Sequence, residues 1–247
     1  MDRAWPACDR EDTGTWVLRA SHGVTQRANS VWPRDPSGAD GDVSAAVRAA
    51  SEWYRRRRLP LIFQVFDDVR SADLNAVLDR ARFTRQSETL IMVRGTRDLQ
   101  GAPPVTPVEL APEPSKEWLH LWWSIDGRGG DRELEIARAI LSGCPSVYAL
   151  VRDDDGQPAA VGRLALAAGW GGIYSMATSA AHRRQGYASR VLAALLTEGR
   201  RLDLQGFWLL VTAANHGAQG LYRRAGFTDS GSYVYRQAPL QRALSGC

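Results

Sequence analysis

A short basic segment, Arg183-Arg184-Gln185-Gly186-Tyr187-Ala188, has residue types suited to binding a phosphate group. It lies between an apolar run typical of a strand and a run with helical spacing, so we expect a helix to begin within it. A helix N-terminus leaves backbone N–H groups unpaired and carries partial positive charge, and both favour an anion. Gly186 would let the main chain approach a pyrophosphate, Ala188 would keep the first turn open, and the arginines would add charge-assisted hydrogen bonds. The alternative is a solvated basic loop before an ordinary helix.

Three motifs, occurring in order, make the chain resemble the GNAT superfamily of N-acetyltransferases. The coenzyme A pyrophosphate loop of that family reads Arg/Gln-x-x-Gly-x-Gly/Ala, and Arg183, Gly186 and Ala188 occupy its three positions. The preceding run, residues 173–178, resembles the family's fourth strand, and Ala225-Gly226-Phe227 belongs to a stretch that resembles its second signature. The resemblance covers about residues 105–236.

The resemblance implies that the C-terminal half binds acetyl-CoA, with the pantetheine arm paired to strand main chain. The coenzyme-binding residues that it implies are Met176, Ala177, Thr178, Arg183, Arg184, Gln185, Gly186, Tyr187, Ala188, Ser189 and Asn215. Asn215 also fits an Asx turn that caps the next helix, and both roles can hold together. Tyr222 is implied to be the general acid that protonates the departing thiolate, the alternative being a core tyrosine.

The general base and the residues that line the acceptor pocket are less clearly indicated by the sequence. No acidic residue lies within 173–178, so the general base is a water chain or one of five residues, Glu109, Glu133, Glu135, His182 and His216. Trp122 and Trp123 follow Trp118 in the region that shapes the acceptor pocket in the family. They would suit an apolar or cationic acceptor, or simply pack a helix on the sheet. No metal is indicated.

Hydrophobic periodicity predicts alternating strands and helices in both halves. In the second half we expect helices at residues 115–123, 131–141, 186–202 and 217–224, and strands at 105–110, 147–151, 159–166, 173–178, 207–211 and 227–235. In the first half we expect strands at residues 16–20, 26–32, 61–66 and 87–93, and helices at 43–55 and 72–80.

An internal repeat suggests two related domains. Residues 78–84 resemble residues 222–228, at a separation of 144, and the surrounding element order also matches. We therefore predict an α/β (α+β) protein with tandem GNAT-like folds, each a mixed, mostly antiparallel sheet flanked by helices. A proline-rich stretch places the boundary near residues 98–104, which gives a domain of residues 1–100 and a catalytic domain of residues 101–247.

The first repeat departs from the family pattern. Asp35, Asp40 and Asp42 would repel a pyrophosphate where the basic loop should be, and Leu78 stands in place of Tyr222. We expect a degenerate domain without a cofactor site that packs against the catalytic domain and walls the acceptor pocket. From its polar stretch at residues 26–30, Arg27 or Asn29 could reach the substrate, or the stretch is ordinary surface polarity.

Composition indicates a globular protein. The chain has 247 residues, of which 44% are hydrophobic and 23% charged, and its three cysteines are too far apart in sequence to indicate a disulfide framework or a zinc site. It lacks a signal-peptide pattern and an apolar run of the roughly 18 residues needed to span a bilayer, so we expect a cytoplasmic protein.

The net charge is +4 with a single lysine, and this arginine bias fits a GC-rich genome or phosphate binding. Residues 55–58, four arginines, fit a helix C-terminus or contact with phosphate or RNA.

The predicted reaction moves an acetyl group from acetyl-CoA to a primary amine of a small molecule. We expect a monomer or weak dimer with no membrane partner and no nucleic-acid partner. One alternative keeps the fold and takes the acyl group from an aminoacyl-tRNA. The other is a non-enzymatic coenzyme A sensor, which the presence of Tyr222 and Asn215 disfavours.

Overall fold

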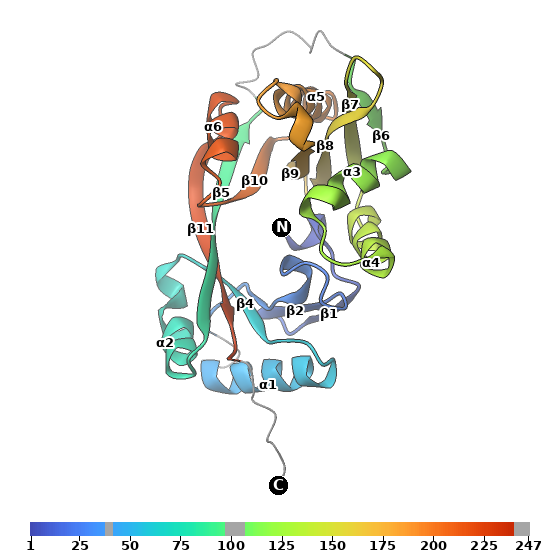
Figure 1. Cartoon of the computed structure of the whole chain (residues 1–247). Coiled ribbons are helices and arrows are strands. Elements are labelled where there is room, and N and C mark those ends of the chain that lie inside the picture. The colour runs from blue at the N-terminus through green and yellow to red at the C-terminus, as the bar shows by residue number, and fades with distance from the viewer. Residues whose placement is uncertain (38–41, 97–106, 240–247) are drawn as a thin grey trace. The chain divides into compact units, whose positions relative to one another are not determined.

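The computed structural model describes residues 1–37, 42–96 and 107–239 (Figure 1). The chain divides into two compact units. Unit 1 comprises Met1–Pro6 and Leu90–Ser230, and unit 2 comprises Ala7–Thr89 and Gly231–Cys247. The boundary predicted at residues 98–104 lies outside the described residues. The units also differ from the predicted ranges 1–100 and 101–247, because each of two long strands, β5 (Thr84–Gly95) and β11 (Thr228–Gln237), contributes residues to both units.

Unit 1 is built on a mostly antiparallel sheet. Strands β6 (Glu109–Ala111), β7 (Ser146–Arg152), β8 (Pro158–Ala167) and β9 (Trp170–Thr178) pair antiparallel in chain order. Strand β10 (Gly206–Thr212) then pairs parallel with β9, and the second half of β5 and the start of β11 complete the order. The fold class predicted for the chain, a mixed and mostly antiparallel sheet flanked by helices, is confirmed.

Helices cover both faces of this sheet. Helix α5 (Tyr187–Arg201) buries an apolar stripe that includes Val191 and Leu195 against residues such as Leu164 and Ile173. Helix α3 (Lys116–Asp126) is capped by Ser115, whose hydroxyl accepts a hydrogen bond from the Trp118 N–H at 3.1 Å, as predicted. The Trp118 indole in turn donates to main-chain carbonyls of β7 and β8. Helices α4 (Asp131–Ser142) and α6 (His216–Arg224) complete unit 1.

The first six residues belong to unit 1, which the sequence did not predict. A short 3-10 helix, η1 (Asp2–Ala4), brings the Ala4 carbonyl within 2.9 Å of the Arg163 Nη1, and this arginine is fully buried in β8. Trp5 stacks on Tyr174 of β9 with ring centroids 5.3 Å apart. The segment therefore fills part of the unit 1 core.

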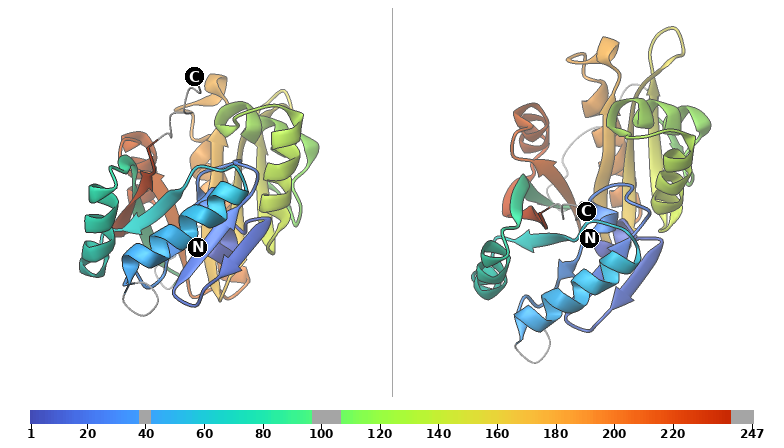
Figure 2. Two further views of the ribbon diagram at one scale, coloured as in Figure 1. Left: turned by 90° about the horizontal axis from the view of Figure 1, so that it is seen from below. Right: turned by 60° about the horizontal axis from the view of Figure 1, so that its bottom comes forward.

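Unit 2 combines strands of two sheets with α-helices, and Figure 2 shows the ribbon from two further sides. Strands β1 (Asp9–Asp12), β2 (Trp16–Ala20) and β3 (Trp32–Pro33) form an antiparallel sheet. Strand β4 (Ile62–Phe66) pairs antiparallel with the end of β11, and the first half of β5 follows on the other side of β11. Helices α1 (Val43–Arg56) and α2 (Ala72–Arg80) close a core around Phe63, Leu74 and Leu78.

Two predicted strands need correction. Residues 26–32 were expected to form a strand, but they contain a 3-10 helix, η2 (Arg27–Asn29), and only the first residue of β3. The Asn29 amide group explains the difference, because it bonds the main chain of residues 21, 23, 24 and 25 and holds them in a compact loop. The strand expected at residues 105–110 begins at Glu109, while residues 105 and 106 lie outside the described residues.

Candidate active site

The site begins where β9 and β10 part. Their parallel pairing runs from Gly206↔Trp170 to Leu209↔Ile173 and ends there. A β-bulge follows in β9, where Ser175 has a φ of 51° and the pairing with β8 skips from Tyr174 to Ala177. Met176 lies within the bulge, and beyond it Ala177 and Thr178 retain β8 on one side, while the pairing of β9 with β10 has ended. Their main-chain groups on that side are available to an extended ligand.

The basic loop follows β9 as predicted. Gly186 adopts a left-handed φ of 85°, and helix α5 begins at the next residue. The first helical hydrogen bond runs from the Arg190 N–H to the Gly186 carbonyl, so the N–H groups of residues 187–189 have no helical acceptor. Arg183 and Arg184 are exposed and form no ion pair with the described residues. This geometry can bind an anion at the helix N-terminus.

The side chain of His182, in the segment between β9 and α5, is held by two hydrogen bonds. Its Nε2 lies 2.9 Å from Asp153 Oδ2, in the turn between β7 and β8, and its Nδ1 lies 2.5 Å from Ser179 Oγ. The His182 ring also meets Tyr187 edge to face at 5.1 Å. Main-chain N–H donation from Gln157 first, and then His182, lower the pKa of Asp153. His182 was predicted as a candidate base, and its contacts with Asp153, Ser179 and Tyr187 are ones that the spacing of the sequence did not reveal.

Asn215 immediately precedes α6, and Tyr222 lies within that helix. The Asn215 Oδ1 accepts a hydrogen bond from the Ala218 N–H at 3.1 Å, so the expected helix cap is present. The Asn215 side chain is otherwise exposed, and its contact with coenzyme A stays a prediction. Inside the helix, the Gln219 amide donates to the carbonyls of Thr212 and Ala213 and ties α6 to the end of β10.

Tyr222 combines burial with an unused hydroxyl group. The residue is only 7% exposed and its ring meets Phe227 edge to face at 6.1 Å. Its hydroxyl makes no hydrogen bond with the residues that the structure describes. Burial, followed by the negative charge of Asp126, raises the pKa of Tyr222 to about 12. The phenol is therefore protonated at neutral pH and can donate a proton.

The predicted tryptophans have different surroundings. Trp122 is buried and meets Trp5 at 6.4 Å and Trp118 at 5.9 Å, so much of its surface packs in unit 1. Trp123 is half-buried and keeps an accessible face. Asp126, at the end of the same helix, is exposed, and its negative charge helps to raise the pKa of Tyr222.

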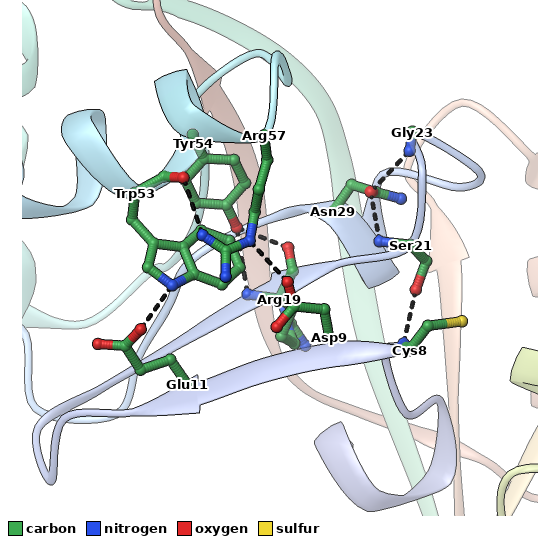
Figure 3. Close-up of polar contacts among 10 residues, drawn as sticks. All are labelled: Cys8, Asp9, Glu11, Arg19, Ser21, Gly23, Asn29, Trp53, Tyr54 and Arg57. Atoms are coloured by element: carbon green, nitrogen blue, oxygen red, sulfur yellow. Dashed lines mark hydrogen bonds and ion pairs between the residues drawn. The ribbon is translucent and has the colours of Figure 1, made fainter.

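Arg27 and Asn29 belong to unit 2, whereas the residues described above belong to unit 1. Asn29 is 2% exposed and its amide group holds the loop of residues 21–25, and Figure 3 shows its bonds to Ser21 and Gly23. A substrate contact by either residue stays a prediction, and for Asn29 it would require these bonds to break.

Three of the four arginines at residues 55–58 form ion pairs within unit 2. Arg57 bonds Asp9 at 2.6 Å and lies 3.4 Å above the Trp53 ring, while Arg55 and Arg56 pair with Glu52 (Figure 3 shows the Arg57 contacts). This supports the structural explanation of the run over the nucleic-acid one.

Other candidate groups can be placed briefly. Within residues 1–37, 42–96 and 107–239, no cluster of three His, Cys, Asp or Glu side chains offers a metal site. Cys8 and Cys144 are free thiols, and Cys247 lies outside the described residues. In the part of the chain that the structure describes, no helix has the length and apolar character needed to cross a membrane.

Comparison with known proteins identifies relatives over nearly the whole chain. Residues 1–236 match the family described as probable histone acetyltransferase Rv0428c C-terminal. The uncharacterized N-acetyltransferase YobR of Bacillus subtilis is 24% identical over 238 residues, which cover 94% of each chain. The probable histone acetyltransferase Rv0428c of Mycobacterium tuberculosis is 30% identical over 155 residues, covering 58% of this chain and 47% of that protein.

Solved structures show the same fold. A GCN5-related N-acetyltransferase from Kribbella flavida superposes with a TM-score of 0.72 at 20% identity, covering 97% of this chain and 93% of the other. A tandem GNAT protein from the clavulanic acid biosynthesis pathway has a TM-score of 0.67 at 13% identity, with coverage of 86% and 76%. Together with the family match, these findings confirm the resemblance seen in the sequence. The chain is an acetyltransferase of the GNAT superfamily and belongs to the family of the Rv0428c C-terminal region.

Proposed function

We propose that the protein transfers an acetyl group from acetyl-CoA to a primary amine of a small molecule, at a site formed by unit 1. The observation that carries this proposal is the open N-terminus of α5. Gly186 offers no side chain to cap it, and two arginines without ion-pair partners among the described residues precede it.

The residues present fit coenzyme A. Arg183, Arg184 and the N–H groups at the start of α5 would hold the pyrophosphate, with Gln185, Gly186, Tyr187, Ala188 and Ser189 as the surrounding loop. Met176, Ala177 and Thr178 would pair with the pantetheine arm through the main-chain groups freed where β9 and β10 part. Asn215 would add its amide nitrogen, since its oxygen already caps α6.

Acetyl-CoA, when bound, supplies an acyl group on a thiol leaving group. The protein's own contribution is to orient the two reactants and to donate a proton. Tyr222 holds that proton on its Oη at neutral pH and has no competing hydrogen bond among the described residues. Direct attack by the amine in a ternary complex requires no nucleophile from the protein.

The test is acetyl transfer by the full-length protein. Acetyl-CoA is incubated with 2-phenylethylamine, n-hexylamine, 1,4-diaminobutane, free lysine and a lysine-containing basic peptide, and thiol release is followed at several pH values. Acetylation of at least one small amine, by one coenzyme molecule bound per chain, is expected. Coenzyme binding without transfer to any amine would favour the sensor, and transfer to the peptide alone would replace the small-molecule acceptor.

A further inference from the structure

Ser175 has a strained backbone at the point in unit 1 where β9 leaves β10. The last residue pair of these two strands is Ile173 with Leu209, so Ser175 lies two residues beyond it. Its φ of 51° is left-handed, a conformation that a serine adopts at a cost because its Cβ crowds the main chain. Such strain persists where the surrounding structure holds it in place, and it is concentrated at functional sites.

The hydroxyl group of Ser175 is a second unfavourable feature. Its Oγ is shielded from solvent and has no hydrogen-bond partner among the described residues. Folded proteins seldom leave a buried hydroxyl group without a partner, because losing contact with water then goes uncompensated. The residue as a whole is only half-buried, and no hydrogen bond fixes its rotamer, so the hydroxyl can turn toward a bound ligand. Both features are explained if the missing partner belongs to a ligand.

The order of groups along coenzyme A places the acyl group at this residue. In the proposed binding mode, the pyrophosphate lies at the start of α5 and the pantetheine arm lies along residues 176–178. The coenzyme continues from that arm to its sulfur and then to the acyl carbon. Moving back along β9 from residue 178 to residue 176, the next residue is Ser175. A coenzyme bound in this direction therefore has its thioester next to Ser175.

We propose that the Ser175 hydroxyl donates a hydrogen bond to the carbonyl oxygen of the bound acyl group and stabilises the negative charge that develops there during transfer. The site then recognises a thioester carbonyl as well as the pantetheine arm. This rests on the proposed acetyl transfer and adds to it a second catalytic residue besides Tyr222.

Acyl transfer balances with these two residues. The amine nitrogen forms its bond to the acyl carbon, and the electron pair of the C=O double bond moves onto the oxygen that Ser175 holds. That pair returns as the bond from carbon to sulfur breaks. Tyr222 gives its proton to the sulfur and regains one from the acylated nitrogen, whereas Ser175 keeps its own proton throughout.

The chain offers a matched control in Ser87. Among the described residues it is the other serine with a left-handed backbone, with a φ of 49°. It lies in β5 within unit 2, and its side chain is exposed. Substitutions of Ser87 therefore change the same kind of backbone position outside the proposed coenzyme site.

The first test replaces Ser175 by Ala and by Gly, which both remove the hydroxyl, while Gly also keeps every main-chain group of the bulge. With the panel amine that the wild type acetylates fastest, kcat should fall at least about tenfold in both variants. The KM for the amine and the affinity for coenzyme A should stay the same. Ser87→Ala and Ser87→Gly should keep the wild-type kcat. An unchanged kcat in both Ser175 variants would refute the assignment while leaving acetyl transfer intact.

Denaturant unfolding separates this role from a structural one. Ser175→Gly removes a strained side chain and a buried hydroxyl group without a described partner, so its unfolding midpoint should equal or exceed that of Ser87→Gly. A midpoint clearly below that of Ser87→Gly would show that the hydroxyl has a partner within the protein, and the assignment would be wrong.

The last test measures binding without turnover. Calorimetry compares acetyl-CoA with S-ethyl-CoA, a thioether that lacks only the carbonyl oxygen. The wild type and Ser87→Gly should bind acetyl-CoA about three- to tenfold more tightly than the thioether, as expected for one hydrogen bond, and Ser175→Ala should bind the two equally. Equal binding of the two probes by the wild type, or a preference that survives in Ser175→Ala, would overturn the proposal even if acetyl transfer itself is observed.

Discussion

The N-termini of α1 and α5 occupy matching positions in the two units, yet one is closed and the other open. Helix α1 begins at Val43 and α5 at Tyr187, a separation of 144 residues. In unit 2, the Asp42 carboxylate accepts a hydrogen bond from the Ala45 N–H at 2.8 Å and supplies the negative charge itself. In unit 1, the matching residue is Gly186, which has no side chain. The helix N-terminus is therefore capped by an aspartate side chain in unit 2, whereas in unit 1 it is open and could bind an anion.

The second helices of the two repeats, α2 and α6, also share their backbone geometry but differ at one side chain. Helices α2 and α6 start at Ala72 and His216, and the bond from Phe83 N–H to the Leu78 carbonyl is matched by one from Phe227 N–H to the Tyr222 carbonyl. Leu78 is fully buried in an apolar core, whereas Tyr222 adds a hydroxyl group that no described residue uses. A single difference, Leu78 against Tyr222 at matching helix positions, separates a core residue from the residue that we propose as the proton donor.

Both repeats also bury an arginine at matching positions in their middle strands. Arg19 of β2 bonds Ser30 and Gln64, which lie within unit 2. Arg163 of β8 bonds Ser146 and the carbonyl of Ala4, so unit 1 depends on its N-terminal segment for one of these partners. The difference predicts that unit 1 is sensitive to changes near residue 5.

The largest expected effect is on stability and follows from that dependence. Trp5 is 4% exposed, stacks on Tyr174 and lies 5.7 Å from the Arg163 guanidinium. Trp5→Ala should lower the free energy of unfolding by about 3 to 5 kcal/mol, as for other buried aromatic truncations. Denaturant unfolding measures this, with Val69→Ala as the control, because Val69 is 91% exposed and should change little. Equal stability of the two variants would show that the segment is not part of the unit 1 core.

The next effect comes from giving unit 1 the cap of unit 2. Gly186→Asp places a carboxylate at the start of α5 and a side chain at a φ of 85°, so coenzyme A should bind more than about a hundredfold more weakly, or about 2.7 kcal/mol. The bulkier, uncharged Gly186→Val should weaken binding at least about tenfold. The matched control is Asp42→Gly, which should leave affinity unchanged, with one coenzyme per chain measured by calorimetry. A second binding event in Asp42→Gly would show that unit 2 retains a cofactor site.

The comparison of α2 with α6 predicts an effect on turnover. Tyr222→Phe keeps the ring contact with Phe227 and removes the proton donor, so kcat should fall about a hundredfold while coenzyme affinity stays the same. Because the pKa of Tyr222 is about 12, the wild type should show no loss of activity from its ionisation below about pH 10. Equal rates for the two proteins across the pH range would make Tyr222 a core residue like Leu78.

The sequence predicts the elements of both repeats better than the contacts that complete the site. Helices such as α5 and α6 have regular apolar spacing and clear termini, so their positions follow from local pattern. Residues 26–32 were mistaken for a strand because the Asn29 amide group, rather than hydrophobic alternation, determines the loop there. Trp5 packs against a residue far away in sequence, Tyr174, and no local pattern indicates such a pair.

The smallest expected effect concerns the contacts of His182, which hold the segment that leads into α5. His182 links Ser179, Asp153 and Tyr187 in unit 1, whereas the matching residue of unit 2, Gly38, lies outside the described residues. His182→Phe should keep the ring contact with Tyr187 but lose both hydrogen bonds, which leaves the loop of residues 183–186 less ordered before the coenzyme binds. We expect coenzyme affinity to fall about 3- to 10-fold, equivalent to about 0.7 to 1.4 kcal/mol, with kcat at saturation nearly unchanged. Asp155→Asn, in the same β7–β8 turn, is the control, because only the main-chain N–H of Asp155 bonds Asp153. If His182→Phe lowers kcat at saturating coenzyme and leaves affinity intact, His182 acts in the chemistry and not in holding the loop.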